Sequence, residues 1–98
     1  MPFTVKIEPS AVEDLESIRV FDRRRIVRAI KEQLTHEPNV MTRYRKPLGE
    51  FGAPFSQTLQ LWEFRVGEFR VFYHIVEDIV LVRAVRAKPP HQTTEQML

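Results

Sequence analysis

Apolar residues at positions 3, 5 and 7 alternate with polar residues at positions 4, 6 and 8 near the start of the chain. A period of two is typical of a strand that buries one face, and it predicts a strand over residues 3–8. Pro9 is expected to end this strand because proline has no N–H to donate to a sheet.

The pattern then changes to the spacing of helices. Ser10, followed three residues later by Glu13, predicts a capping box, and apolar positions 11, 15 and 18 extend a first helix to about Val20. Asp22 is expected to cap a second helix, in which apolar positions 26, 30 and 34 lie on one stripe until Pro38 ends it. The two helices are expected to form a hairpin.

The second half of the chain reads as a loop followed by strands. Residues 39–57 show no sustained period, three of the seven prolines fall at positions 38–54, and basic residues cluster at positions 43–46, which predicts a mostly irregular basic loop. Three apolar stretches at about 58–66, 69–75 and 79–86 are separated by short turn signals and predict an antiparallel meander. The expected fold class is α+β, in a single domain over residues 1–98. It consists of an N-terminal strand, a two-helix hairpin and a three-stranded antiparallel meander, with the helices packed on one face of the sheet.

The turn between the first two strands of the meander sets their register. Gly67-Glu68 suits a two-residue type II′ turn, which pairs Val66 with Phe69. Counting outward puts Phe64 opposite Val71 and Trp62 opposite Tyr73 on the core face. The second face then carries Arg65 opposite Arg70, Glu63 opposite Phe72 and Leu61 opposite His74. A tight turn at Glu77-Asp78 would add Val80, Val82 and Ala84 to the core face and place Arg83 opposite Phe72.

Like charges that face one another across two strands destabilise a sheet unless something compensates them. Glu63 on the same face is one candidate to neutralise the pair of Arg65 and Arg70. The alternative is that the pair binds an anion, because two guanidinium groups on a rigid sheet form a preorganised phosphate clamp.

Composition narrows the possible chemistry. The 98 residues contain no cysteine, which excludes a disulfide framework, a cysteine-ligated zinc site, an iron–sulfur cluster and a thiol nucleophile. The histidines at positions 36, 74 and 91 lack metal-site spacing, so no metal is expected. No apolar run approaches the roughly 20 residues of a membrane-spanning helix, and the first residues lack signal-peptide features. A cytoplasmic protein that does not contact a membrane is expected.

The net charge of +2 hides an uneven distribution. Residues 1–22 carry two basic and five acidic groups, whereas residues 23–50 carry eight basic and three acidic groups. Arginine makes up eleven of the fifteen basic residues, which suits bidentate recognition of phosphate or carboxylate. A solvated helix face is the alternative explanation of the basic run.

Two segments carry a resemblance to a known family. The loop contains Arg43-Tyr44-Arg45-Lys46-Pro47-Leu48, and the hairpin reads Leu61-Trp62-Glu63-Phe64-Arg65-Val66-Gly67-Glu68-Phe69-Arg70-Val71-Phe72-Tyr73. With the preceding strand and helical hairpin, they resemble the RelE/ParE toxin superfamily over nearly the whole chain. The resemblance implies the toxin of a toxin–antitoxin pair, and its RelE-like branch implies an enzyme that cuts mRNA in the ribosomal A site without a metal. The partners it implies are a cognate antitoxin, the ribosome and mRNA, and it implies no cofactor.

The resemblance also suggests roles for individual residues. Arg65 and Arg70 match basic positions on the strands before and after the turn and are expected to hold phosphate, and Lys88 falls near a further basic position. Attack of a ribose 2′-OH on the adjacent phosphorus needs a base, cations on the phosphoryl oxygens and an acid for the 5′-oxygen. The tail after residue 88 has no tyrosine where many active members carry one, which leaves His91 and Glu63 as candidates for acid and base. Their alternative roles are a solvated tail histidine and a salt-bridge partner of the arginines.

A wider set of cations is expected to contact RNA phosphates, in a salt-dependent and largely sequence-independent way. Its members are Arg23, Arg24, Arg25, Arg28, Arg43, Arg45, Lys46 and Arg83. Two other functions stay open: a ParE-like inhibitor that binds DNA gyrase without chemistry, and a family member that binds only its antitoxin. A general nucleic-acid module is less favoured because Trp62, Phe64, Phe69 and Tyr73 fall on the predicted core face instead of on a stacking surface.

Overall fold

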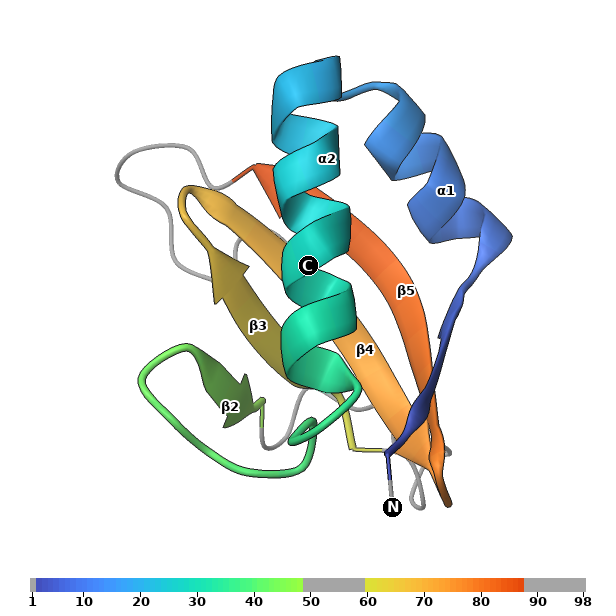
Figure 1. The fold of residues 1–98 in the computed structure, drawn as a ribbon, viewed down its shortest axis with the longest axis vertical. Helices are drawn as coiled ribbons and strands as arrows, with labels where there is room; N and C mark the ends of the chain where they lie inside the picture. Colours follow the sequence, from blue (N-terminus) through green and yellow to red (C-terminus); the bar gives the residue numbers. More distant parts are fainter. Residues whose placement is uncertain (1, 49–59, 88–98) are drawn as a thin grey trace.

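Two helices lie across one face of a five-stranded sheet (Figure 1). The computed structural model describes residues 2–48 and 60–87. The strands have the spatial order β1-β5-β4-β3-β2, in which β1 and β5 run parallel and the other neighbours antiparallel. The elements are β1 (Thr4–Ile7), α1 (Pro9–Glu16), α2 (Val20–Ala29), a π-helical turn η1 (Ile30–Leu34), β2 (Arg45–Pro47), β3 (Trp62–Val66), β4 (Phe69–Val76) and β5 (Ile79–Ala87). The predicted α+β class is confirmed. Within the described residues, no helix is long and apolar enough to cross a membrane.

Helix α1 begins without the predicted capping box. Glu8 is the N-cap residue in extended conformation, and Pro9 follows as the first helical residue, where its missing N–H costs nothing. Ser10 Oγ instead donates to the carbonyl oxygen of Arg83 at 2.7 Å, which ties the helix start to β5. The helix also ends at Glu16, earlier than expected.

Helix α2 begins at Val20, with Arg19 as its N-cap residue. Asp22 therefore lies inside the first turn instead of capping the helix, and its carboxylate pairs with Arg19 at 3.1 Å and Arg25 at 3.4 Å. An acidic group there is favourable because the N-terminus of a helix carries partial positive charge. The predicted apolar stripe is confirmed, since it continues through η1 as the buried residues Ile26, Ile30 and Leu34.

The core lies between the helices and the sheet. Apolar side chains of α1, α2 and η1 pack there against the inward-facing residues of β3, β4 and β5. Trp62 and Tyr73 stack across β3 and β4, with ring centroids 6.1 Å apart. The Tyr73 hydroxyl donates to the carbonyl oxygen of Pro38 at 2.6 Å, which links the centre of the sheet to the segment after η1.

The predicted register of β3 and β4 is confirmed from Val66 opposite Phe69 to Trp62 opposite Tyr73, and the pairing of Leu61 with His74 stays a prediction. Gly67 has a φ of 58°, and Glu68 is not among the non-glycine residues with positive φ, as a type II′ turn requires. Because the turn contains only two residues, it fixes which residues of β3 and β4 face one another. Residues that face one another have their side chains on the same face of the sheet. We call the face that carries Glu63, Arg65, Arg70 and Phe72, opposite the helices, the far face.

Residues 45–47 correct the prediction of an irregular loop. They form the edge strand β2, which pairs antiparallel with β3 and places Arg45 opposite Phe64. The sequence Arg-Lys-Pro has no apolar alternation, so this strand has no signal of its own in the sequence. One of its two residues on the core side is charged: Arg45 is paired with Glu37 at 3.3 Å. Residues 49–57 of the predicted loop lie outside the described residues.

Strand β5 corrects a second prediction. A register shift between Phe72 and Tyr73 places Ala84 opposite Phe72 and Val82 opposite Tyr73, so Arg83 is the extra residue of a bulge. The expected pairing of Arg83 with Phe72 is therefore wrong, and Ala84 lies on the far face instead of the core face. Val80 and Val82 join the core as predicted.

Candidate functional site

The bulge in β5 completes a row of three arginines across the far face. Arg65 on β3 lies opposite Arg70 on β4, and Arg70 lies opposite Arg86 on β5. Sequence reasoning placed Arg65 and Arg70 correctly but missed Arg86, because counting outward from the Glu77-Asp78 turn without a bulge sets Arg86 opposite Phe69, on the core face. Three consecutive strands thus present a cation at the same level of the sheet.

The first two arginines of the row differ in exposure. The Arg65 side chain is exposed, whereas Arg70 is only 7% exposed. One terminal nitrogen of Arg70, Nη1, donates to the carbonyl oxygens of Gly67 and Phe69, each at 3.0 Å. Burial and the neighbouring Arg65 charge lower the pKa of Arg70, and Glu63 partly opposes them. Arginine nevertheless stays protonated at any physiological pH.

Arg70 therefore holds the turn while adding positive charge opposite Arg65. Its Nε is buried without a hydrogen-bond partner in the described part of the chain. A buried donor left unpaired costs stability, and such costs are concentrated at functional sites.

A second arginine fixes the same turn from the helix side. The Arg25 guanidinium lies 5.9 Å from the centroid of the Phe69 ring and is held by Asp22. A Cβ atom added to Gly67 would come within 3.2 Å of Arg25 Nη1. Glycine at this position thus permits both the positive φ and the close approach of the helix. The backbone that carries Arg65 and Arg70 is therefore anchored on both sides of the sheet.

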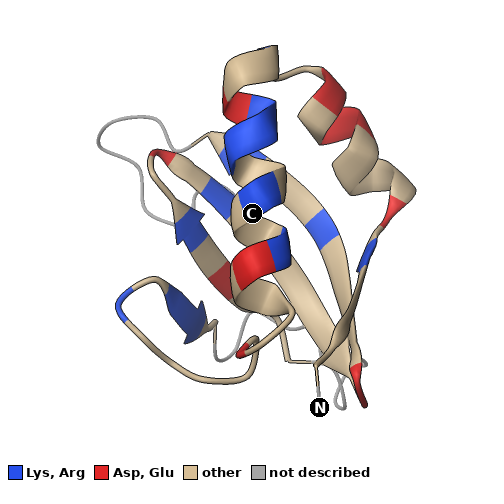
Figure 2. Cartoon of the chain, in the orientation of Figure 1, with Lys and Arg blue, Asp and Glu red and all other residues tan. Residues whose placement is uncertain are grey.

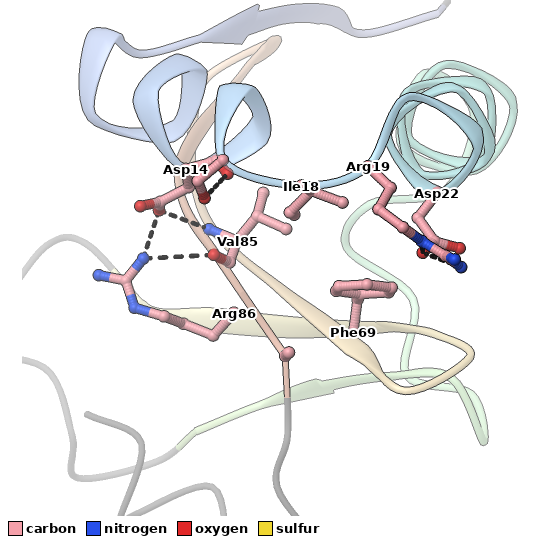
Figure 3. A pocket seen from close by; sticks show the side chains of 9 residues that line it. Asp14, Ile18, Arg19, Asp22, Phe69, Val85 and Arg86 are labelled. Atoms are coloured by element: carbon pink, nitrogen blue, oxygen red, sulfur yellow. Dashed lines mark hydrogen bonds and ion pairs between the residues drawn. The ribbon is translucent and has the colours of Figure 1, made fainter.

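Arg86 lines an open pocket of about 540 Å³ between the α1–α2 connection and the ends of β4 and β5. Its guanidinium pairs with the carboxylate of Asp14 on α1, and Figure 3 shows the two side chains turned toward one another. The same carboxylate accepts the backbone N–H of Val85 at 2.9 Å. Arg19 and Asp22 form a second ion pair on the opposite wall of the pocket (Figure 3). Arg86 is thus held toward α1, at the end of the arginine row.

Glu63, a candidate base, lies in the next row of the far face. It is opposite Lys46 on β2 and Phe72 on β4, and its side chain is 1% exposed. Lys46 is exposed beside it. His74 is half-buried farther along β4, with Nδ1 lying 3.2 Å from the carbonyl oxygen of Gln60. The catalytic role of Glu63 stays a prediction, as do those of Lys88 and His91, which lie outside the described residues.

The predicted cations of α2 divide into two groups. Arg23 is half-buried and donates to backbone carbonyls at the end of α1, including that of Leu15 at 2.8 Å. Arg24 and Arg28 are exposed, and Figure 2 shows basic positions along α2 and on β2, β3 and β4. Arg24 and Arg28 line an open hollow on α2 together with Arg25.

The remaining predicted cations differ in exposure: Arg43 and Arg83 are exposed, whereas Arg45 is buried. Arg43 is exposed, but Arg45 is 4% exposed and its guanidinium is bound to Glu37 and Gln33. Arg83 is exposed at the bulge, 3.8 Å from a carboxylate oxygen of Glu8, near α1. The structure therefore brings together Arg65, Arg70 and Lys46, with Arg25 against the same turn from the helix side, and it separates them from Arg24, Arg28 and Arg83.

The chain matches a known protein family over most of its length. Residues 5–88 match the family model described as the ParE toxin of the type II toxin–antitoxin system parDE. A search of curated proteins gives no match.

Two solved structures share the fold. A chain of the RelBE2 toxin–antitoxin complex from Mycobacterium tuberculosis aligns with a TM-score of 0.74 and 24% identity, covering 90% of this chain and 100% of that one. A chain of the archaeal RelE–RelB complex from Pyrococcus horikoshii aligns with a TM-score of 0.69 and 22% identity, covering 92% of this chain and 99% of that one.

Proposed function

This chain belongs to the ParE toxin family of type II toxin–antitoxin systems, and from that premise we propose that it is a metal-independent ribonuclease that cuts ribosome-bound mRNA. The observation that carries the proposal is the arginine row on the far face, where Arg65, Arg70 and Arg86 occupy facing positions on three strands. The facing charges of Arg65 and Arg70 are unfavourable by themselves and favourable once a phosphate lies against them, whereas the charge of Arg86 is paired with Asp14.

The proposed reaction is attack of the ribose 2′-oxygen on the adjacent phosphorus. The new O2′–P bond forms as the P–O5′ bond breaks, which leaves a 2′,3′-cyclic phosphate and a 5′-hydroxyl. A base takes the proton of the 2′-OH and an acid gives a proton to O5′. Arg65 is the exposed group that would contact the phosphoryl oxygens, and the charge of Arg70 on the neighbouring strand would stabilise the growing negative charge. Glu63, Lys88 and His91 are the candidates for base and acid.

Exposed arginines outside the row are proposed to bind RNA. Arg24, Arg28 and Arg43 would contact phosphates of ribosomal RNA, which would make binding strongly dependent on salt. A cognate antitoxin is the proposed protein partner, because both similar structures are toxin–antitoxin complexes.

The test is a translation extract programmed with a defined mRNA, in which the 5′ ends of mRNA fragments are mapped. Arg65→Ala is the suitable variant because Arg65 is exposed, whereas Arg70→Ala would also remove two hydrogen bonds that hold the turn. Lys6→Ala is the matched control, since it removes an exposed cation from β1 at the other edge of the sheet.

We expect the wild type and Lys6→Ala to cut at A-site codons. Arg65→Ala should cut about 100-fold more slowly, as for the loss of one donor that stabilises a transition-state oxyanion. Intact mRNA with folded wild type, or full cleavage by Arg65→Ala, would refute the proposal.

The burial of Glu63 favours a second function, inhibition of DNA gyrase by binding without chemistry. At 1% exposure, this carboxylate would need a local rearrangement before it reached a 2′-OH. A supercoiling assay distinguishes the two functions. Gyrase inhibition with mRNA left intact would support the second one.

A further inference from the structure

The arginine row has an aromatic neighbour at the edge of the sheet. Arg45 lies opposite Phe64 on β2 and β3, so the next antiparallel position sets Tyr44 against Arg65. The backbone N–H of Arg65 donates to the carbonyl oxygen of Tyr44 at 2.7 Å, in agreement with this register. Tyr44, directly before β2, therefore continues the line that Arg65, Arg70 and Arg86 form across β3, β4 and β5.

Tyr44 lies at a bend directly before β2. The side chain of Arg45 turns toward the helices, where it is 4% exposed and bound to Glu37. The alternation of β2 does not extend to the bend at Tyr44, so the place of Tyr44 beside Arg65 rests on the backbone hydrogen bond between the two residues. Tyr44 is 55% exposed, so its ring is open to solvent beside an exposed guanidinium.

The backbone of Tyr44 is held in place although its ring is exposed. Thr42 Oγ1 accepts the backbone N–H groups of Tyr44 at 3.1 Å and of Arg45 at 3.2 Å. The backbone N–H of Thr42 donates to the carbonyl oxygen of Arg45 at 2.9 Å. A large exposed ring on a well-bonded backbone adds little to the core but is preorganised for contact with a ligand.

We infer that Tyr44 is a stacking platform for a nucleobase of the RNA whose phosphate lies at Arg65. This inference rests on the proposed function. Adjacent strands are about 4.8 Å apart, and the backbones that carry Tyr44 and Arg65 are close neighbours. An aromatic ring beside a cation is the usual pairing in single-stranded RNA sites, where the ring takes the base and the cation takes the backbone. Because every base has a π-face, Tyr44 would strengthen binding without selecting one base.

The test uses a short single-stranded RNA that contains one 2-aminopurine, whose fluorescence falls when it stacks. Affinity and quenching are measured at low salt for the full-length wild type, Tyr44→Ala, Tyr44→Phe and Arg65→Ala. Met41→Ala is the matched control, because Met41 is 70% exposed in the same segment but outside the row. A second RNA with an abasic site in place of the 2-aminopurine reports binding through the backbone alone.

Loss of one stacked base weakens binding by about 5- to 100-fold. We expect Tyr44→Ala to show this loss together with loss of quenching, and Tyr44→Phe to keep both because a phenyl ring also stacks. Wild type and Tyr44→Ala should bind the abasic RNA equally, and Met41→Ala should behave as the wild type.

Equal affinity and equal quenching for wild type and Tyr44→Ala, with binding still weakened by Arg65→Ala, would overturn this inference and leave the proposed function standing. Failure of Tyr44→Phe would also overturn it, since the hydroxyl and not the ring would then be required. RNA binding that neither Arg65→Ala nor Tyr44→Ala affects would count against both proposals.

Discussion

The hydroxyl of Tyr73 provides a quantitative test of how the sheet is joined to the segment after η1. Tyr73 is fully buried and donates to the carbonyl oxygen of Pro38, a residue that is also buried. Tyr73→Phe keeps the ring stacked on Trp62 but leaves that carbonyl oxygen without its donor. An unpaired buried polar group costs about 1–3 kcal/mol, so we expect the free energy of unfolding at pH 8 to fall by this amount.

The same hydroxyl makes stability depend on alkaline pH. Burial raises the pKa of Tyr73 well above its ordinary value, against an opposing effect of the Arg45 charge. The unfolded chain therefore loses this proton near pH 10, while the folded protein still keeps it. Stability is fully present below pH 10 and falls above it, by about 1.4 kcal/mol per pH unit from this group.

The hydrogen bond to Pro38 makes the wild type more stable than Tyr73→Phe, whereas the raised pKa of the Tyr73 hydroxyl makes the wild type lose stability at alkaline pH. The wild type starts about 1–3 kcal/mol more stable and loses that advantage above pH 10, so the two stabilities become equal between about pH 11 and pH 12. Urea unfolding of both proteins from pH 8 to pH 12 measures the difference, in which all other titrating groups cancel. A difference that stays constant over this range would refute the burial and protonation assigned to Tyr73.

Three further predictions concern the connections that shape the far face. Gly67→Ala should destabilise the protein by about 1–2 kcal/mol in thermal or urea unfolding, because it combines a positive φ with a Cβ pressed against Arg25; unchanged stability would contradict the described turn. Glu77 has a φ of 56°, so Glu77→Gly should raise the free energy of unfolding by about 0.5–1 kcal/mol, and a loss of stability would show that this strain is absent. Asp14→Ala should cost about 1–3 kcal/mol because it leaves the backbone N–H of Val85 unpaired, whereas Asp14→Asn, which keeps an acceptor, should cost less. Equal losses in the two Asp14 variants would indicate that the charge matters more than the hydrogen bond.

Much of the fold follows from local patterns in the sequence. The strand at the N-terminus, the helical hairpin and the meander each have a recognisable period, and the turn at Gly67 sets the pairing of Arg65 with Arg70. These features depend on residues close together in the chain. Helix boundaries were less predictable, because Ser10 found a more distant partner in the carbonyl group of Arg83.

Tertiary structure decided which residues of the site are reachable. The bulge at Arg83 brings Arg86 into the arginine row, and β2 brings Tyr44 opposite Arg65. It also buries Arg70, whose charge the sequence alone would place in solvent. Periodicity determines which face of its own strand a residue occupies. The strand's neighbours, its bulges and the side chains that cover it are set by contacts between distant residues, for which the local pattern carries no signal.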